Sequence, residues 1–200
     1  MVIVLFLYSI LQTDGSIQEK FANAQAGSIY FLLIYYSSFA MLSAVGSVIY
    51  SNQYKASWFL STPPMVGPGN LFIGVLKSLF IQFFLPCYLV ISIGILFVWG
   101  ATSLLHLGIG FINLISIFGI MSHSYLTRLP FSEDWANQNK GSNFMNVMGA
   151  MMMAGIIGFL HYFLRDQYLY LGIQTVVVLL ITFFTYQKLQ RKPWHKLKIA

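Results

Sequence analysis

Four histidines are the side chains best suited to metal binding or acid–base chemistry in this sequence: His106, His123, His161 and His195. A metalloprotease-type site needs two histidines four residues apart with a glutamate between them, and no such spacing occurs. The five acidic residues all fall in polar segments. An enzyme built on His123 or His161 would therefore lack a partner acid at suitable depth. We expect interfacial hydrogen bonds from the histidines, no catalytic residue, no metal ligand and no cofactor.

Other chemistry-bearing residues point to packing more than to reactions. The methionines at 145, 148 and 151–153 could bind a soft metal, but helix packing or lipid contact is the simpler interpretation. The lone Cys87 cannot form an internal disulfide. No glycine-rich phosphate loop and no nucleophile elbow occurs, so this chain has no motif for hydrolysing nucleotides.

A short charged segment, His161 with Arg165 and Asp166, separates two apolar stretches near the C-terminus. It could bind an anionic headgroup or substrate. The alternative is that these long side chains extend from helix ends into a polar interface, as charged residues commonly do there.

The composition predicts an all-α, polytopic transmembrane helical bundle. Of the 200 residues, 58% are hydrophobic and 8% are charged, and the apolar residues form long runs able to cross a hydrocarbon core as helices. We predict about six spans, the first short, as though its beginning were missing: 1–11, 28–50, 72–100, 101–121, 142–160 and 168–186.

Within these spans, Pro86 predicts a kink, and a connection with few polar residues predicts a tight hairpin between 72–100 and 101–121. Small residues recur at helical spacing and predict close helix packing. They are Ala40 and Ala44 in one span, and Ala150, Ala154 and Gly158 in another.

The longest polar interruption, residues 50–70, carries its own helical pattern. Ser51 can cap a helix, and Tyr50, Tyr54 and Trp58 recur every four residues, so their rings share one face of an α-helix. Pro63-Pro64 ends that pattern. The amphipathic segment 51–64 is then either an interfacial anchor or an element on which a partner docks.

Positive charges set the expected orientation. Counting alternate sides gives nine Lys or Arg residues on one side, namely Lys55, Lys77, Arg128, Lys140 and five in the basic tail 187–200. The other side has two, Lys20 and Arg165. The nine-residue side should be cytoplasmic, with both termini there, and His106 and His161 could share the opposite side. The net charge of +6 then reflects a flank facing anionic lipid rather than a nucleic-acid site.

This layout resembles the permease half of an exporter-type ABC transporter. One stretch of the sequence is similar to the same region of bacterial ABC permease-like proteins. It comprises Tyr54-Lys55-Ala56-Ser57-Trp58-Phe59, followed by Pro63-Pro64, Gly74 and Lys77. The later Leu-Pro-Phe-Ser segment at 129–132 also has a similar look. The short first span and the short loop before the last span depart from the family pattern.

The resemblance implies a multi-pass subunit of the inner (plasma) membrane that a separate cytoplasmic ABC ATPase drives. That ATPase would dock on Tyr54, Lys55, Trp58 and Phe59. The second loop, with Arg128, Glu133, Asp134 and Trp135, is a further docking candidate. A homodimer or second permease would complete the pathway. The alternative from another class is a non-transporting assembly, anchoring or immunity protein that acts through helix–helix contacts.

Overall fold

The computed structural model describes residues 30–62, 67–137, 140–194 and 197, and the regular secondary structure of this part is helical. No strand forms among these residues, and an isolated parallel bridge joins Tyr50 to Glu133. The predicted all-α class is confirmed for this part of the chain. The predicted span 1–11 lies outside it.

The predicted span 28–50 contains a break. It divides into α3 (Tyr30–Tyr36) and α4 (Ser38–Ser47). At the break, Ser37 Oγ donates to the carbonyl of Ile34 at 2.7 Å, and Ser38 Oγ donates to that of Tyr35 at 2.6 Å. Serine hydroxyls that bond to carbonyls one turn back often bend helices. The bend thus follows from two adjacent serines within an apolar run.

The next apolar run is one continuous helical stretch with a π-helical turn inside it. It comprises α5 (Gly69–Leu79), η2 (Phe80–Phe84) and α6 (Leu85–Trp99). Pro86 lies in the first turn of α6, and its ring would clash with the carbonyl of Gln82 in a regular α-helix. The wider π turn relieves this clash, so the helix irregularity predicted from Pro86 has a defined location.

A hairpin then reverses the chain. Gly100 has φ +70°, a conformation that glycine adopts without steric cost, and it ends α6. The short η3 (Gly100–Ser103) leads into α7 (Leu104–Tyr125). Tyr88 Oη donates to the carbonyl of Leu107 at 2.6 Å, and this bond joins the two arms of the predicted hairpin.

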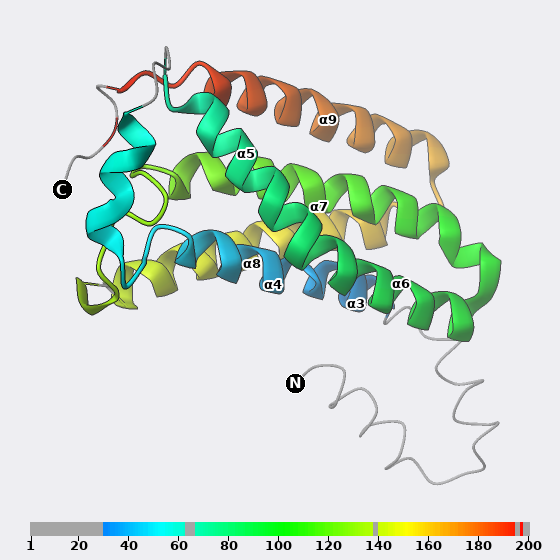
Figure 1. Cartoon of the computed structure of the whole chain (residues 1–200). Helices are drawn as coiled ribbons and strands as arrows, with labels where there is room; N and C mark the ends of the chain where they lie inside the picture. The colour runs from blue at the N-terminus through cyan, green and yellow to red at the C-terminus, as the bar shows by residue number, and fades with distance from the viewer. Residues whose placement is uncertain (1–29, 63–66, 138–139, 195–196, 198–200) are drawn as a thin grey trace, which may run out of the picture.

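The remaining elements are η4 (Trp135–Asn137), α8 (Lys140–Phe163) and α9 (Tyr168–Gln190). Figure 1 shows α7 inside the bundle, and it contacts α3, α4, α8 and α9. At one end, η1 (Tyr54–Ser61) lies across the bundle together with segment 126–137 and the end of α9. We call this the loop end, and the opposite end, with η3 and residues 164–167, the hairpin end.

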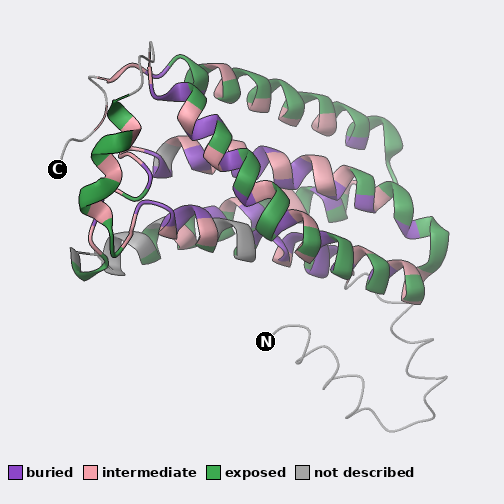
Figure 2. Ribbon diagram, in the orientation of Figure 1, coloured by how far each residue is buried: buried purple, intermediate pink, exposed green. Residues whose placement is uncertain are grey.

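Many large apolar side chains of α8 and α9 are exposed, and Figure 2 shows how much of α9 is exposed. On α9, Leu171 and Leu189 are buried, whereas large side chains such as Phe183 and Phe184 are exposed. Among the described residues, two stretches are long and apolar enough to cross a membrane, Gly69–His123 and Tyr168–Gln190. The first folds back at Gly100, and its two arms contact each other through long side chains such as Phe84 and Phe111.

Glycines in α5 provide a matched test of the packing at the loop end. A Cβ on Gly69 would overlap the backbone carbonyl of Gln190, whereas a Cβ on Gly74 would meet no atom within 4 Å. We predict that Gly69→Ala lowers the free energy of unfolding by about 1–3 kcal/mol through overpacking. Gly74→Ala should raise it by up to about 1 kcal/mol through helix propensity. Thermal unfolding of the purified variants measures both, and equal melting temperatures would contradict the close approach of α5 to α9.

Candidate functional site

A chain of polar side chains links α3, α7 and α8 inside the bundle, towards the hairpin end. Asn113 Nδ2 donates to Tyr35 Oη at 2.7 Å. Tyr35 Oη lies 3.0 Å from Nδ1 of His161, and Nε2 of His161 lies 3.3 Å from Nδ1 of His106. Asn113 and His161 are fully buried, and Tyr35 nearly so. We call these four residues the polar chain.

Close aromatic packing holds the polar chain in place. The Phe31 ring meets the His161 ring edge-on at 4.9 Å and the His106 ring at 5.1 Å. Gly158 lets the Tyr35 ring approach α8, because a Cβ there would lie 2.9 Å from Tyr35 Cδ2. Phe31 therefore positions the two imidazole rings, and Gly158 positions the Tyr35 ring, although neither residue belongs to the polar chain.

Each bond of the polar chain holds one proton, so the chain has a direction. If Asn113 donates to Tyr35, the tyrosine O–H donates to Nδ1 of His161, and Nε2–H of His161 donates to His106. The reverse direction requires the Asn113 amide to turn by 180°. Asn113 Oδ1 is buried and has no hydrogen-bond partner among the described residues, and this turn would give it the tyrosine proton. Both directions use neutral imidazoles.

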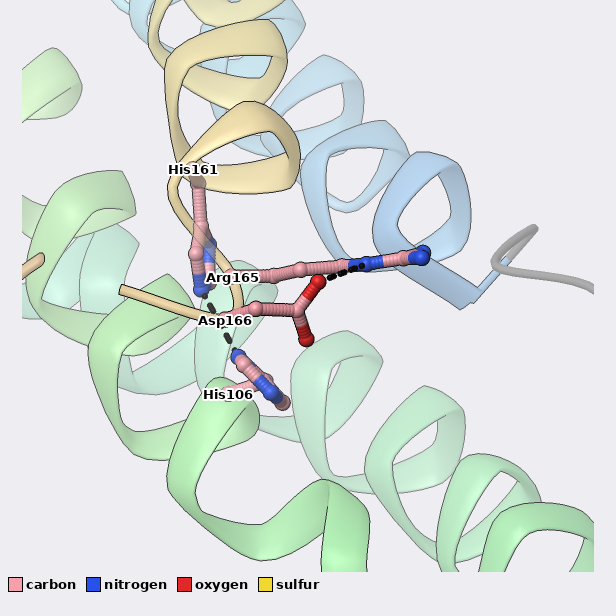
Figure 3. Close-up of polar contacts among 4 residues, drawn as sticks. All are labelled: His106, His161, Arg165 and Asp166. Atoms are coloured by element: carbon pink, nitrogen blue, oxygen red, sulfur yellow. Dashed lines mark hydrogen bonds and ion pairs between the residues drawn. The ribbon is translucent and has the colours of Figure 1, made fainter. Parts of the chain in front are cut away.

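At the hairpin end the polar chain meets a charged pair (Figure 3). Arg165 Nε donates to Asp166 Oδ2 at 3.2 Å, and the Arg165 guanidinium lies 5.0 Å from the centre of the Tyr162 ring. Figure 3 shows Arg165 extending from the turn between α8 and α9 towards α3, with the Asp166 carboxylate between Arg165 and His106. The two charges neutralise one another locally.

The polar chain is suited to relaying a proton and to holding three helices together. It offers exchangeable protons from His106 to Asn113, but its four members include no carboxylate and no thiol. Among the described residues, no three His, Cys, Asp or Glu side chains lie close enough to hold a metal ion. A hydrogen bond between neutral partners contributes about 0.5–1.5 kcal/mol, and a buried group that loses its partner costs about 1–3 kcal/mol.

The loop end is assembled by backbone pairing between two segments far apart in sequence. Phe131 N donates to the carbonyl of Val48 at 2.9 Å and Glu133 N to that of Ile49 at 3.0 Å, and Ser51 N donates to the Glu133 carbonyl at 2.8 Å. The buried Glu133 carboxylate forms an ion pair with Arg128. The two polar loops that the charge count assigned to one side therefore do lie together.

Aromatic and helix-start contacts complete this connection. The rings of Tyr50 and Trp135 lie 5.4 Å apart, and Asp134 Oδ1 accepts a hydrogen bond from Ala136 N at 3.0 Å at the start of η4. Among the predicted second-loop residues, Glu133 and Arg128 thus have structural partners, whereas Trp135 is 43% exposed.

The first residues of the basic tail also belong to the loop end. Lys192 Nζ donates to the carbonyl of Leu126 and lies 5.4 Å from the centre of the Phe72 ring. Burial lowers the pKa of this amine below its usual value, because the charged form loses water. Lys192 therefore ties the end of α9 to α5 and α7 and is buried, whereas the sequence placed it in a basic tail facing anionic lipid.

The predicted aromatic face of segment 51–64 is wrong. Residues 54–61 form a 3₁₀ helix, with three residues per turn, so Tyr54 and Trp58 fall on different faces. Ser51 does not cap it, since its hydroxyl accepts from Gln53 N at 3.1 Å before the helix begins. No residue of η1 is buried, and Trp58 and Phe59 are 66% and 65% exposed. Lys55 is also exposed.

The small residues lie at helix contacts. Ala150 and Ala154 are buried and, with Gly158, face α3 and α4. Ala44 packs half-buried against the core, and the side chain of Ala40 is outside the described part.

Comparison with known proteins adds no relative. No family model, curated protein or solved structure matches this chain. The site must therefore be judged on its own residues. The sequence expectation that His106 and His161 share one end is confirmed by their contact, but Tyr35 and Asn113 were missed. The available signal was Asn113, an amide in the middle of an apolar stretch.

Removing one hydroxyl tests the polar chain. Tyr35→Phe leaves a buried donor on Asn113 and a nitrogen of His161 without their partner, so we expect the free energy of unfolding to fall by about 1–3 kcal/mol. The control is Tyr36→Phe, whose ring stacks on Phe39 at 6.2 Å, with an expected change within about 0.5 kcal/mol. Thermal unfolding measures both, and similar melting temperatures would rule out an energetic role for the Tyr35 hydroxyl.

Proposed function

We propose that the chain is a polytopic membrane protein. The support is the exposure of many large apolar side chains on α8 and α9, while the polar residues Asn113, Ser116 and His161 are fully buried. In water such exposed apolar side chains would drive association, whereas hydrocarbon solvates them at no cost. In this proposal the described helices and residues 1–11 supply about six spans.

The proposed orientation puts the loop end and the C-terminus in the cytoplasm of a cell whose inner (plasma) membrane holds the protein. The loop end carries the basic residues Lys55, Arg128 and Lys192. Among the residues that the structure describes, the hairpin end carries one Lys or Arg residue, Arg165. Cytoplasmic loops carry an excess of Lys and Arg, and this asymmetry supports the assignment.

Its proposed role is that of a permease-like subunit of an ATP-driven transporter, with a separate ABC ATPase docked at the loop end. The observation that carries this role is the exposure of Trp58 and Phe59 on η1. Such aromatic side chains are typical anchors of a protein interface. Movement of a docked ATPase would reach α4 and α7 through the backbone pairing of 48–51 with 131–133. A second copy or a partner permease would complete the pathway.

Cysteine labelling tests the membrane placement. Cys87 is the single cysteine, so Cys87→Ala provides a background for Lys55→Cys and Gln167→Cys, at exposed positions on opposite ends. In intact cells a membrane-impermeant maleimide should label the Gln167→Cys variant. The Lys55→Cys variant should react only after the cells are permeabilised. The reverse pattern would invert the orientation. Recovery of the protein in the soluble fraction would contradict membrane insertion.

Affinity purification from native membranes tests the ATPase partner. We expect the wild-type protein to co-purify with an ATPase that carries a phosphate-binding loop, and Trp58→Ala/Phe59→Ala to lose it by at least about tenfold, the loss expected for two interface anchors. Tyr168→Ala, which removes an aromatic ring 68% exposed at the other end, should retain it. An unchanged ATPase yield from the double variant would refute docking at η1. If the wild type retains no ATPase, the non-transporting alternative is favoured.

A further inference from the structure

An apolar groove of about 470 Å³ runs along the outside of the bundle between α8 and the pair α3 and α4. Its walls come from both sides and include Phe31, Tyr35, Phe39, Met151, Phe159 and Tyr162. Small residues of α8, among them Gly155, form its floor. The groove is therefore hollowed by the lack of side chains on one helix.

The shape of the groove suits an extended hydrocarbon chain. From Met151 to Tyr162 the lining covers three turns of α8, about 16 Å at 1.5 Å per residue. A Cβ on Gly155 would meet no atom within 4 Å, so the space above it is open from the surface. A flexible acyl chain can enter such a groove sideways from a bilayer.

Charge marks one end of the groove. Tyr162 closes the groove at the hairpin end, and the Arg165 guanidinium lies 5.0 Å from its ring. Asp166 bonds to Arg165 at 3.2 Å, and its side chain is 85% exposed. Among the described residues, the charged side chains at this end are Arg165 and Asp166. A ligand there meets a positive and a negative group side by side, with no net charge.

We propose that this groove binds a zwitterionic phospholipid, phosphatidylethanolamine. One acyl chain lies along α8, the phosphate is placed beside Arg165, and the primary ammonium beside Asp166. A guanidinium matches phosphate geometry, and an exposed ion pair is weak enough to admit a second pair of charges. Phosphatidylcholine has no ammonium N–H to donate to the carboxylate, and phosphatidylglycerol places no positive charge there. The inference rests on the membrane placement proposed above, but not on the ATPase.

Native mass spectrometry of the purified full chain tests this site. The probe is an equimolar mixture of phosphatidylethanolamine, phosphatidylglycerol and phosphatidylcholine with identical acyl chains. The wild type should retain one phosphatidylethanolamine at least fivefold over either competitor. Equal retention of the three lipids, or preference for phosphatidylglycerol, would overturn the headgroup assignment.

Two glycines on α8 provide matched variants. Gly155→Leu places a side chain in the groove, at a position where a Cβ meets no atom within 4 Å, and should reduce the retained lipid at least tenfold. Gly149→Leu adds the same side chain where a Cβ also meets nothing within 4 Å, outside the groove lining, and should retain lipid like the wild type. Equal melting temperatures of the two variants show that folding is intact. Undiminished lipid on Gly155→Leu would overturn the groove as the binding site.

A further variant addresses the acidic partner. Asp166→Asn keeps the groove and Arg165, so it should retain lipid while losing the preference for phosphatidylethanolamine over phosphatidylglycerol. A preserved preference would overturn the role of the carboxylate. If cysteine labelling supports the membrane placement and no lipid is retained, this inference alone fails. A soluble protein would end both.

Discussion

Buried polar groups need partners, and this requirement organises the centre of the bundle. Asn113 on α7, Tyr35 on α3 and His161 on α8 each have too little solvent contact to bond water, so they must bond one another. That requirement specifies how the three helices face one another, which apolar contacts alone would leave loosely defined. In the membrane placement that we propose, the constraint is stronger, because lipid offers no alternative partner.

The two ends of the bundle obey the same rule in different ways. At the loop end, pairing of 48–51 with 131–133 and the Lys192 bond to Leu126 satisfy backbone groups, and they tie three loops into one unit. At the hairpin end, a glycine turn and a charged pair complete the connections. In the role that we propose, force applied at the loop end would therefore reach several helices through this backbone pairing.

Sequence reasoning located the long apolar helices but not their irregularities. Helix length follows from apolar runs, whereas the break at Ser37 depends on whether two hydroxyls bond back to carbonyls, which periodicity does not reveal. The aromatic spacing at 50, 54 and 58 indicated a helix correctly, but it could not distinguish α from 3₁₀ winding. For the polar chain, helix order brought His106 and His161 to one end. The rotation of each helix about its axis decides that Tyr35 rather than Tyr36 joins the polar chain. This rotation cannot be predicted from sequence runs that are apolar on every face.

Gly155 and Gly158 have different surroundings that their spacing in the sequence does not reveal. They lie one turn apart on α8, yet a side chain at Gly158 would strike Tyr35, whereas one at Gly155 would meet open space. Gly158 makes room for Tyr35 of the polar chain, whereas Gly155 keeps the groove open. Tyr35 belongs to both, because its hydroxyl bonds His161 and its ring lines the groove. In the lipid binding that we propose, an occupant of the groove would therefore press on the same ring whose hydroxyl belongs to the polar chain, so the two features would be coupled through one side chain.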